Sequence, residues 1–378
     1  MHRSLLLALS SLALIAASCG ASTAGDSPAG VHQIKDQFRI EVLGTFDEPW
    51  ALALLPDGKS ALITERGGAL KLWSASGAVP VSGVPPVDSG GQGGLGDIAL
   101  SPDFAASGMV YLSWVEAGAR DTRGAVVGRA KLTSRSNGSS LDGLTVIWRQ
   151  DPKVTGRGHF SHRITFSPDG KFLFVASGER QKFTPAQDLN ANLGKIVRLD
   201  LDGPPAPGNP FAAKGGLSAQ IWTYGHRNIL GLQFDAAAQL WDLEHGPAGG
   251  DELNLVQPGQ NYGWPLVSDG DHYDGKPIPR NSTRPDLAQP AISWNPVIAP
   301  GDFIFYSGKL WPEWKGQALI AGLGSQGLVR VRIGGARGIE EARYPLGERI
   351  REIREAPDGS LLVLEDGTGG RLLRLTRK

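Results

Sequence analysis

FSPDGK, at residues 166–171, is a turn signature whose recurrence along the chain decides the fold. Related stretches are LLPDGK (54–59), LSPDF (100–104), FDAAAQ (234–239) and APDGS (356–360). A short apolar run, such as RITF or WALALL, precedes most copies, and another, such as KFLFVASG or SALITER, follows. Strand, Asp-Gly turn, strand is the pattern of a β-hairpin. The sequence therefore predicts a series of hairpins.

The spacing of these turns predicts the architecture. Successive copies are 46, 66, 66 and 123 residues apart, counted between Asp57, Asp103, Asp169, Asp235 and Asp358. The longest interval leaves room for a further copy, and FIFYSGKLWPEWKGQALIAGL (303–323) fits it as strand, glycine turn, strand. Units of this size, with about four strands each, are typical of propellers. We predict an all-β fold, a six-bladed β-propeller, with a large β-sandwich or a β-helix as alternatives.

Composition limits the class of protein. The chain has 378 residues, 40% of them hydrophobic, with 38 basic and 38 acidic residues and a formal net charge of zero. This is enough apolar sequence for a packed core, and we find no basic stripe of the kind that nucleic acids require. We see no amphipathic helical pattern of twelve or more residues. We expect one catalytic domain at residues 38–378 and no nucleic-acid partner.

The N-terminus predicts export. A basic start leads into a mostly apolar run at residues 5–17, as in a signal peptide covering residues 1–18. The single cysteine, Cys19, follows Ala-Ala-Ser and resembles an acylated lipoprotein site, although the position three before it is Ala16 rather than leucine. Cleavage after Ala24 is the alternative. Residues 19–37 are predicted to be a flexible tether, and the protein to be periplasmic, with a lipid anchor if Cys19 is acylated.

Long insertions should gather on one face of a propeller, so the chemistry is expected among residues 92–97, 151–163, 181–195, 226–228, 244–264 and 322–326. One insertion carries His159 and His162. Residues three apart on a strand face opposite sides, so a metal shared by the two histidines is disfavoured. One of them, pointing toward the channel, could move a proton; hydrogen bonding within the loop is the structural alternative.

Three further stretches have chemical potential. Arg227 and Asn228 begin a strand, and an arginine fork binds planar anions, although packing on Tyr224 would also explain it. LEHGPAGGDELNLVQPGQNYGWP (243–265) is rich in the oxygens that Ca²⁺ prefers, but could be a surface loop. Arg349 and Arg351 should share a face of a strand, which suits a polyanion or the nearby Glu348 and Glu352.

Taken in order, these motifs resemble a family. They are PWALALLPDGKSALITER, GQGGLGDIALSPDF, the H-x-x-x-R stretch at His159, AQDLNANLGKIVRLDLDG, YGHRNILGL, EHGPAGGDELNLV, GQNYGWP and RIREIREAPDG. Together they make the chain, from about Phe38 to its end, similar to the soluble PQQ-dependent aldose dehydrogenases of the glucose/sorbosone type. The resemblance implies a six-bladed propeller that oxidises aldose sugars to lactones and passes the electrons to an acceptor that the sequence does not name.

The resemblance also implies roles for individual residues. His159 falls on the family's catalytic base, and Arg227 would help to polarise the quinone. The PQQ site would comprise Gln92, His159, Arg227, Asn228, Arg349 and Arg351, with the arginine pair on the carboxylates. The carbonyl oxygens of Gly246 and Pro247 would hold one Ca²⁺, and Glu252 with the backbone of Tyr262 a second.

Two positions depart from the family pattern. A lysine that contacts PQQ in the glucose-oxidising members is replaced by Gly324, and Ser325 or Gln326 would have to compensate. His162 stands where the family usually has glycine. A Ca²⁺-dependent lactonase on the same fold and a carbohydrate-binding propeller without cofactor are the competing functions; the arginine pair does not suit the lactonase.

Overall fold

The Asp-Gly turns join the first two strands of successive sheets in the computed structural model, which describes residues 32–135 and 138–378. FSPDGK lies between β11 (Ser161–Phe166) and β12 (Phe172–Ser177), and the other copies lie between β3 and β4, β7 and β8, β15 and β16, and β23 and β24. The segment 303–323 likewise contains β19 and β20. The predicted hairpins are therefore confirmed. Residues 1–31, with the predicted signal peptide and Cys19, lie outside the described residues.

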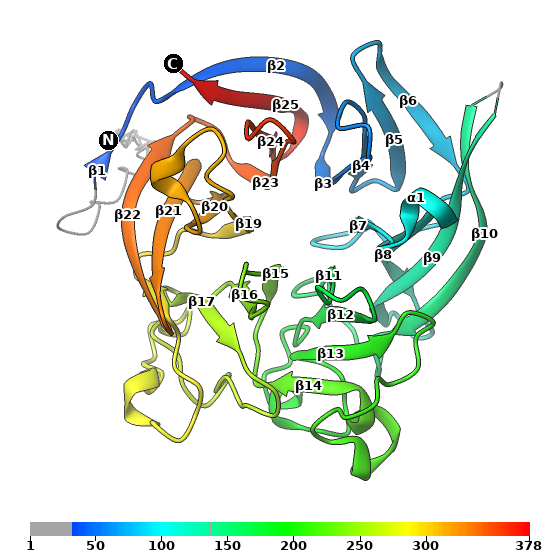
Figure 1. Cartoon of the computed structure of the whole chain (residues 1–378). Helices are drawn as coiled ribbons and strands as arrows, with labels where there is room; N and C mark the ends of the chain where they lie inside the picture. Colours follow the sequence, from blue (N-terminus) through cyan, green and yellow to red (C-terminus); the bar gives the residue numbers. More distant parts are fainter. Residues whose placement is uncertain (1–31, 136–137) are drawn as a thin grey trace, which may run out of the picture. The chain divides into compact units, whose positions relative to one another are not determined.

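The strands form five sheets, in which nearly all neighbouring strands are antiparallel (Figure 1). An eight-stranded sheet contains β3 (Pro49–Leu54), β4 (Ala61–Glu65), β5 (Ala69–Ser74), β6 (Gly77–Ser82), β7 (Leu95–Leu100), β8 (Met109–Ala117), β9 (Arg123–Arg135) and β10 (Gly138–Arg149). Two four-stranded sheets follow, the first with β11, β12, β13 (Lys195–Asp200) and β14 (Ile221–Tyr224), the second with β15 (Ile229–Phe234), β16 (Leu240–Glu244), β17 (Asp251–Val256) and β18 (Ile292–Trp294).

The last two sheets bring the ends of the described chain together. β19 (Pro300–Phe305), β20 (Ala318–Gly322), β21 (Gly327–Gly334) and β22 (Arg337–Pro345) are joined by β1 (His32–Gln33), which falls within the predicted tether. The final sheet contains β23 (Ile350–Glu355), β24 (Leu361–Glu365), β25 (Thr368–Arg377) and, antiparallel to β25, β2 (Phe38–Asp47). Pairing of an N-terminal strand with the C-terminal one closes the circle of sheets.

Helices are few and short in the described residues. They are α1 (Phe104–Ser107) and the 3-10 turns Thr184–Gln187, Ala212–Lys214, Gly216–Gln220, Asn281–Thr283 and Pro312–Trp314. None of the described helices is long and apolar enough to cross a membrane. The all-β prediction is confirmed.

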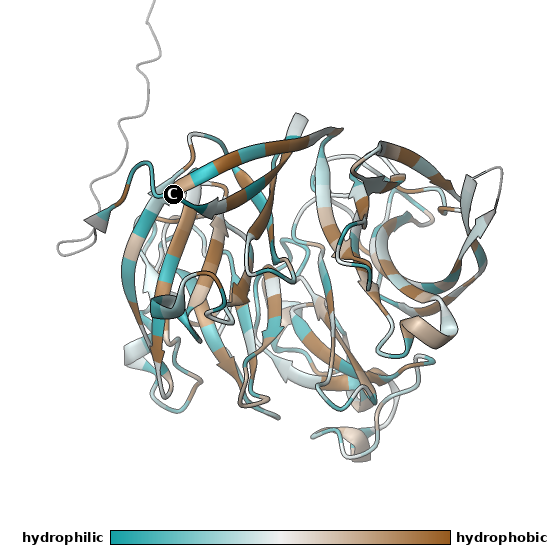
Figure 2. Ribbon diagram, turned by 45° about the horizontal axis from the view of Figure 1, so that its top comes forward, coloured by the Kyte–Doolittle hydropathy of each residue, from teal (hydrophilic) through white to brown (hydrophobic). Residues whose placement is uncertain are grey.

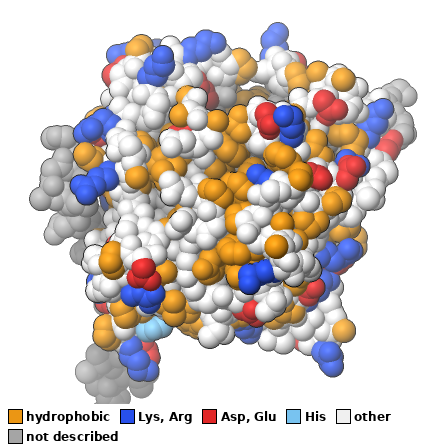
Figure 3. All heavy atoms as spheres, turned by 60° about the horizontal axis from the view of Figure 1, so that its bottom comes forward, with side chains coloured by type: hydrophobic (Ala, Val, Ile, Leu, Met, Phe, Trp, Pro, Cys, Tyr) orange, Lys and Arg blue, Asp and Glu red, His pale blue; other side chains and the backbone are white. Residues whose placement is uncertain are grey.

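The core lies between neighbouring sheets. The second strands β4, β16, β20 and β24 are buried along their whole length, which explains why they read as near-continuous apolar runs such as ALIAG and LLVLE. Figure 2 shows apolar positions recurring along the strands. On the face shown in Figure 3, acidic and basic side chains are interspersed around the margin, and hydrophobic ones lie nearer the middle.

The first strands contact one another in cyclic order, β3, β7, β11, β15, β19, β23 and back to β3. Arg163 on β11 lies in their midst. Its guanidinium donates to the carbonyl oxygens of Leu230 on β15 (2.6 Å) and Gly301 on β19 (2.9 Å). It pairs with Asp97 on β7 and Glu352 on β23, and lies 4.1 Å from the ring centre of Trp50 on β3. One buried cation thus touches all of these strands.

Candidate active site

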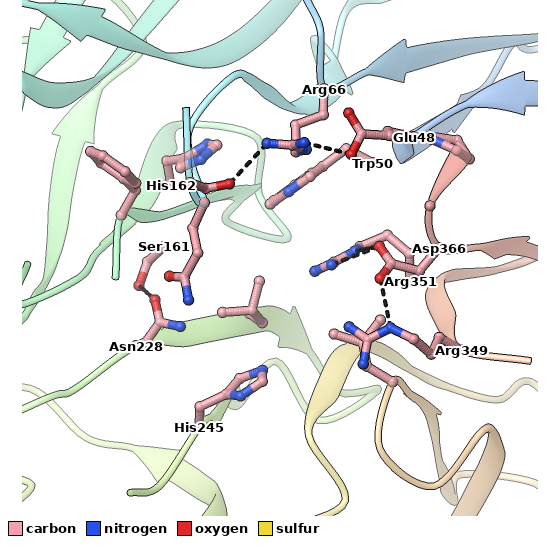
Figure 4. A pocket seen from close by; sticks show the side chains of 17 residues that line it. Glu48, Trp50, Arg66, Ser161, His162, Asn228, His245, Arg349, Arg351 and Asp366 are labelled. Atoms are coloured by element: carbon pink, nitrogen blue, oxygen red, sulfur yellow. Dashed lines mark hydrogen bonds and ion pairs between the residues drawn. The ribbon is translucent and has the colours of Figure 1, made fainter. Parts of the chain in front are cut away.

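Three neighbouring cavities collect the predicted site residues. The arginine cavity, about 280 Å³, is lined by Gln92, His162, Asn228, Arg349, Arg351 and Asp366, among others (Figure 4). The histidine cavity, about 260 Å³, is lined by His159, Glu179, Phe183, Arg227, Trp264 and Tyr273, together with Pro247 and His272. A third, narrow cavity is lined by Glu244, Gly246, Glu252 and Tyr262. Arg227 borders the second and third cavities, and His245 the first and third.

His159 is held by one amide oxygen and one carboxylate oxygen. Its backbone N–H donates to Gln92 Oε1 at 2.7 Å, and its Nδ1 lies 2.5 Å from Glu179 Oε1. Because a carboxylate accepts, Nδ1 carries the proton, and Nε2 keeps its lone pair. Nε2 makes no hydrogen bond with any described residue. The arrangement presents a neutral, oriented base in the histidine cavity.

Charges around His159 favour that neutral form. Burial lowers the pKa of His159 below its ordinary value, and the positive charges of Arg227 and Arg180 act in the same direction. Glu179 opposes them by raising the pKa. Glu179 is itself fixed by the backbone N–H groups of Lys182 and Phe183, at 2.6 Å each. Sequence reasoning missed Glu179 because nothing in SGERQ distinguishes it from a surface carboxylate.

The backbone here is unusual. His159, Ser161 and His162 have φ angles of 49°, 58° and 61°, in the left-handed region that favours glycine. Such clusters of strained residues persist only where their surroundings hold them, often at functional sites. His159 therefore precedes the strand rather than lying on it.

His162 belongs to a different environment. Its ring stacks on Trp50 at 5.1 Å between centres, and its Nδ1 lies 2.8 Å from Ser113 Oγ. Burial lowers the pKa of His162 to about 3. Its φ of 61° accounts for a glycine preference in relatives, and its ring fills space beside Trp50. The two histidines have separate partners: Glu179 for His159, and Trp50 with Ser113 for His162.

Arg227 is positioned by backbone and ring contacts. Its backbone N–H donates to Glu244 Oε2 at 2.7 Å, and its NH1 donates to the carbonyl oxygen of His245 at 3.0 Å. The guanidinium lies 5.2 Å from the ring centre of Trp264, and its NH2 donates to Tyr273 Oη at 3.2 Å. The alternative of packing on Tyr224 is wrong. Its buried Nε has no hydrogen-bond partner among the described residues and is available to a ligand.

The arginine pair converges, as predicted, but its partner is another carboxylate. Arg349 Nε lies 2.9 Å from Asp366 Oδ2, and Arg351 NH2 lies 2.8 Å from Asp366 Oδ1 (Figure 4). Of the two carboxylates offered as the structural alternative, Glu348 and Glu352, the second pairs with Arg163 instead. Two guanidinium groups and one carboxylate leave a net positive charge, which suits an anionic ligand.

Asn228 and Gln92 lie on the opposite side of the arginine cavity. Asn228 Oδ1 accepts from Ser161 Oγ at 3.3 Å. Gln92 uses its Oε1 for the backbone of His159, so it connects the two larger cavities. Arg227 does not line the cavity that contains Asn228, although the two are neighbours in sequence.

The residues predicted to bind metal surround the narrow cavity, apart from Pro247, which faces the histidine cavity. Gly246 N–H donates to Asp251 Oδ1 at 2.9 Å, and among the described residues no donor bonds the carbonyl oxygen of Gly246 or Pro247. Glu252 accepts from Asn281 Nδ2 at 2.6 Å. Burial raises the pKa of Glu252 well above its ordinary value, and Glu244 adds to the effect. Free carbonyl oxygens beside a buried carboxylate fit a hard cation.

The missing lysine has a local cause. A Cβ on Gly324 would lie 2.9 Å from the carbonyl oxygen of Ile298, so a side chain there requires the backbone to move. Leu323 lines the arginine cavity, whereas Ser325 and Gln326 do not. Compensation by Ser325 or Gln326 therefore stays a prediction.

Comparison with known proteins agrees with this geometry. The family model described as glucose/sorbosone dehydrogenase matches residues 46–374. The aldose sugar dehydrogenase YliI of Escherichia coli K12 is 38% identical over 385 aligned residues, covering 100% of this chain and 99% of that protein.

Two solved structures are similar. The apo-form of the soluble aldose sugar dehydrogenase from Escherichia coli superposes with a TM-score of 0.86 at 38% identity, over 90% of this chain and 100% of that one. The PQQ-bound aldose sugar dehydrogenase from Streptomyces coelicolor gives 0.72 at 28% identity, over 90% and 98%. The chain belongs to the glucose/sorbosone dehydrogenase family.

Proposed function

We propose that this protein oxidises aldose sugars at the anomeric carbon to lactones, using PQQ and Ca²⁺. Family membership supports an oxidoreductase that acts on sugars, and the PQQ-bound relative supports the cofactor. The observation that carries the proposal is the His159–Glu179 pair, a neutral base in a cavity beside the arginine pair. His159 in one cavity can accept a proton, while the arginine pair in the neighbouring cavity holds an anion.

We infer that the fold is a six-bladed β-propeller. The inference rests on the cyclic contacts of β3, β7, β11, β15, β19 and β23, and on the strand runs that follow each of them. The eight-stranded sheet then counts as two blades that join through a short parallel pairing of β6 with β10. The N-terminal β2 completes the last blade.

The residues present fit the cofactor. PQQ is planar and carries three carboxylates, and the arginine cavity offers the forks of Arg349 and Arg351 with a net positive charge. Asn228 lines the same cavity, and the unpartnered Nε of Arg227 lies on the other side of His245. Gly246 and Pro247 would hold one Ca²⁺ through their carbonyl oxygens, and Glu252 with the Tyr262 backbone a second.

The mechanism follows from the orientation of His159. Its Nε2 takes the proton of the hydroxyl on the anomeric carbon, while Glu179 holds Nδ1–H and stabilises the imidazolium that forms. Arg227 supplies positive charge close to His159 that would help to polarise the quinone. When bound, PQQ supplies a quinone carbonyl as hydride acceptor, and Ca²⁺ polarises it. Phe183, Trp264 and Tyr273 form an apolar wall of the same cavity, against which a sugar ring could pack.

Reconstitution tests the proposal. The purified protein, loaded with PQQ and Ca²⁺, is expected to reduce an artificial dye when aldoses are added. Absence of dye reduction with every aldose, together with no PQQ absorbance retained on the protein, would reject it. Sugar binding without oxidation would instead favour the carbohydrate-binding alternative.

We also propose that the protein is exported to the periplasm, with Cys19 as the site of a lipid anchor. This rests on residues 1–24 of the sequence alone. Mass spectrometry of the mature N-terminus distinguishes an acylated Cys19 from cleavage after Ala24.

A further inference from the structure

A second group of ionisable side chains is buried beside the narrow cavity, which one of its members, Glu244, lines. His226 lies in the loop between β14 and β15, and Asp242 and Glu244 lie on β16. Two positions apart on a strand, the carboxyl groups share one face. His226 and Asp242 have no solvent exposure and Glu244 is 4% exposed. Burial of two carboxyl groups at one histidine is costly without a compensating charge.

The three groups converge on one point. His226 Nδ1 lies 3.1 Å from Glu244 Oε1 and 3.5 Å from Asp242 Oδ2. One ligand atom from each residue lies within 4.8 Å of the other two. In residues 32–135 and 138–378, no other group of three His, Cys, Asp or Glu side chains has its ligand atoms this close together. A single ion could contact all three atoms.

Hydrogen bonds do not satisfy this group. Asp242 Oδ2 is buried without a hydrogen-bond donor among the described residues, and so is Asn254 Oδ1. Nδ1 of His226 can carry one proton, which cannot serve two carboxylates fully. Nε2 faces Thr223 Oγ1 at 2.9 Å and contributes nothing to them. An acceptor aimed at the group is left over.

Asn254 offers a fourth oxygen. Its Nδ2 now donates to Asp242 Oδ1 at 3.1 Å and to Glu244 Oε1 at 3.3 Å. Rotation of the amide by half a turn exchanges nitrogen for oxygen with little change of shape. Oδ1 would then face the same point as the carboxylates. The set becomes one imidazole nitrogen with carboxylate and amide oxygens.

We propose that His226, Asp242, Glu244 and Asn254 form a binding site for a divalent transition metal, Zn²⁺ or Mn²⁺. An imidazole ligand favours these ions over Ca²⁺, which takes oxygen ligands. The proposed ligands differ from the predicted calcium ligands, although Glu244 lines the narrow cavity together with Gly246, Glu252 and Tyr262, so the two sites adjoin. Since Glu244 Oε2 also accepts the backbone N–H of Arg227, a metal here holds that arginine in place.

Metal analysis tests the proposal. The full protein is stripped with EDTA, then dialysed separately against Zn²⁺, Mn²⁺ and Ca²⁺, and its metal content and unfolding temperature are measured. We expect one equivalent of Zn²⁺ or Mn²⁺ to be retained and to raise the unfolding temperature. Asp242→Asn should weaken this binding at least tenfold, whereas the control Asp169→Asn, in the exposed turn between β11 and β12, should keep it.

Two results overturn the proposal. One is no retained transition metal; the other is equal binding by Asp242→Asn and wild type. Either means that the group is a hydrogen-bonded network that shares a proton. If Asp242→Asn does not fold, the wild-type protein loaded with Co²⁺ decides, because X-ray absorption must show a nitrogen ligand; a shell of oxygens alone rejects the site. The readouts do not depend on sugar oxidation, so the proposed function can fail separately.

Discussion

Arg163, among the first strands of the sheets, and Arg227, in the histidine cavity, are both buried, yet they differ in how many of their nitrogen atoms have a hydrogen-bond or ion-pair partner. Every nitrogen of Arg163 has a partner, in carbonyl oxygens of two strands and carboxylates of two more. Arg227 uses NH1 and NH2, but Nε has none among the described residues. A fully paired buried cation fixes a structure, whereas a partly paired one has capacity left for a ligand.

The same contrast separates His159 from His162. His162 lines the arginine cavity, but its ring stacks on Trp50, its Nδ1 lies against Ser113 Oγ, and it has no carboxylate partner among the described residues. His159 has one nitrogen held by Glu179 and the other unbonded among the described residues. Three residues of sequence thus separate a side chain that fills space from one that can react.

His159→Gln should produce the largest effect on turnover. Without the base, kcat should fall by about 10²–10⁴-fold, the usual contribution of a positioned general base. PQQ binding and the unfolding temperature should change little, since glutamine keeps a polar group of similar size. Steady-state kinetics and PQQ absorbance provide the measurement.

His272→Gln is the matched control, because His272 lines the same cavity without a carboxylate partner of the kind that orients His159. It should keep wild-type turnover within a few-fold. Normal turnover by His159→Gln would show that another group is the base.

Arg163→Met should have the largest effect on stability. Removing one partner of a buried ion pair typically costs about 3–5 kcal/mol, and here it also takes a donor from two carbonyl oxygens and a cation from Asp97 and Glu352. Urea unfolding is the measurement. Arg227→Met should lower the free energy of unfolding much less and reduce turnover instead. Equal destabilisation by the two variants would contradict the distinction drawn between them.

The fold was accessible from sequence because it repeats. The turn signatures and the apolar strands on either side of them are local signals that recur around the fold with variations, so single errors do not matter. The convergence of Arg349 with Arg351 was predicted from strand alternation, but Arg349 precedes β23 and the pairing with β24 shifts between Ile350 and Glu352; both guanidinium groups meet at Asp366.

The partners of these side chains could not be predicted from the sequence. Asp366 binds both arginines from a loop after β24, and Glu179 reaches His159 across 20 residues. Nothing local marks either carboxylate, since each pairing depends on how two loops meet at the face of the sheets. The stacking of His162 on Trp50 likewise joins strands of different sheets. Residue types can be read locally, but their pairing requires the tertiary structure.

Glu179→Gln should change the pH dependence of turnover. The base works only when neutral, so activity falls on the acid side at the pKa of His159. Glu179 raises that pKa, and loss of its charge therefore lowers it. The acid limb of the kcat/KM profile should move to lower pH, and the plateau should fall because the ring is less well oriented. A limb that moves to higher pH would show that Glu179 does not act on His159 through its charge.

The smallest effect concerns His162 and the pH dependence of stability. In the folded protein burial lowers the pKa of His162 to about 3, whereas in the unfolded chain it is about 6.5. Between these values only the unfolded chain binds the proton, so stability falls as pH decreases, by at most about 1.4 kcal/mol per unit.

His162→Asn tolerates the positive φ and does not titrate. Its stability should be lower at pH 7, through lost stacking, but its deficit against wild type should shrink by about 1–2 kcal/mol at pH 5. His245, whose pKa burial also lowers to about 3, keeps part of the slope in both proteins. Urea unfolding at the two pH values measures the difference. A deficit that stays constant would mean that His162 takes up a proton in the folded protein, and so is less shielded from solvent than its burial indicates.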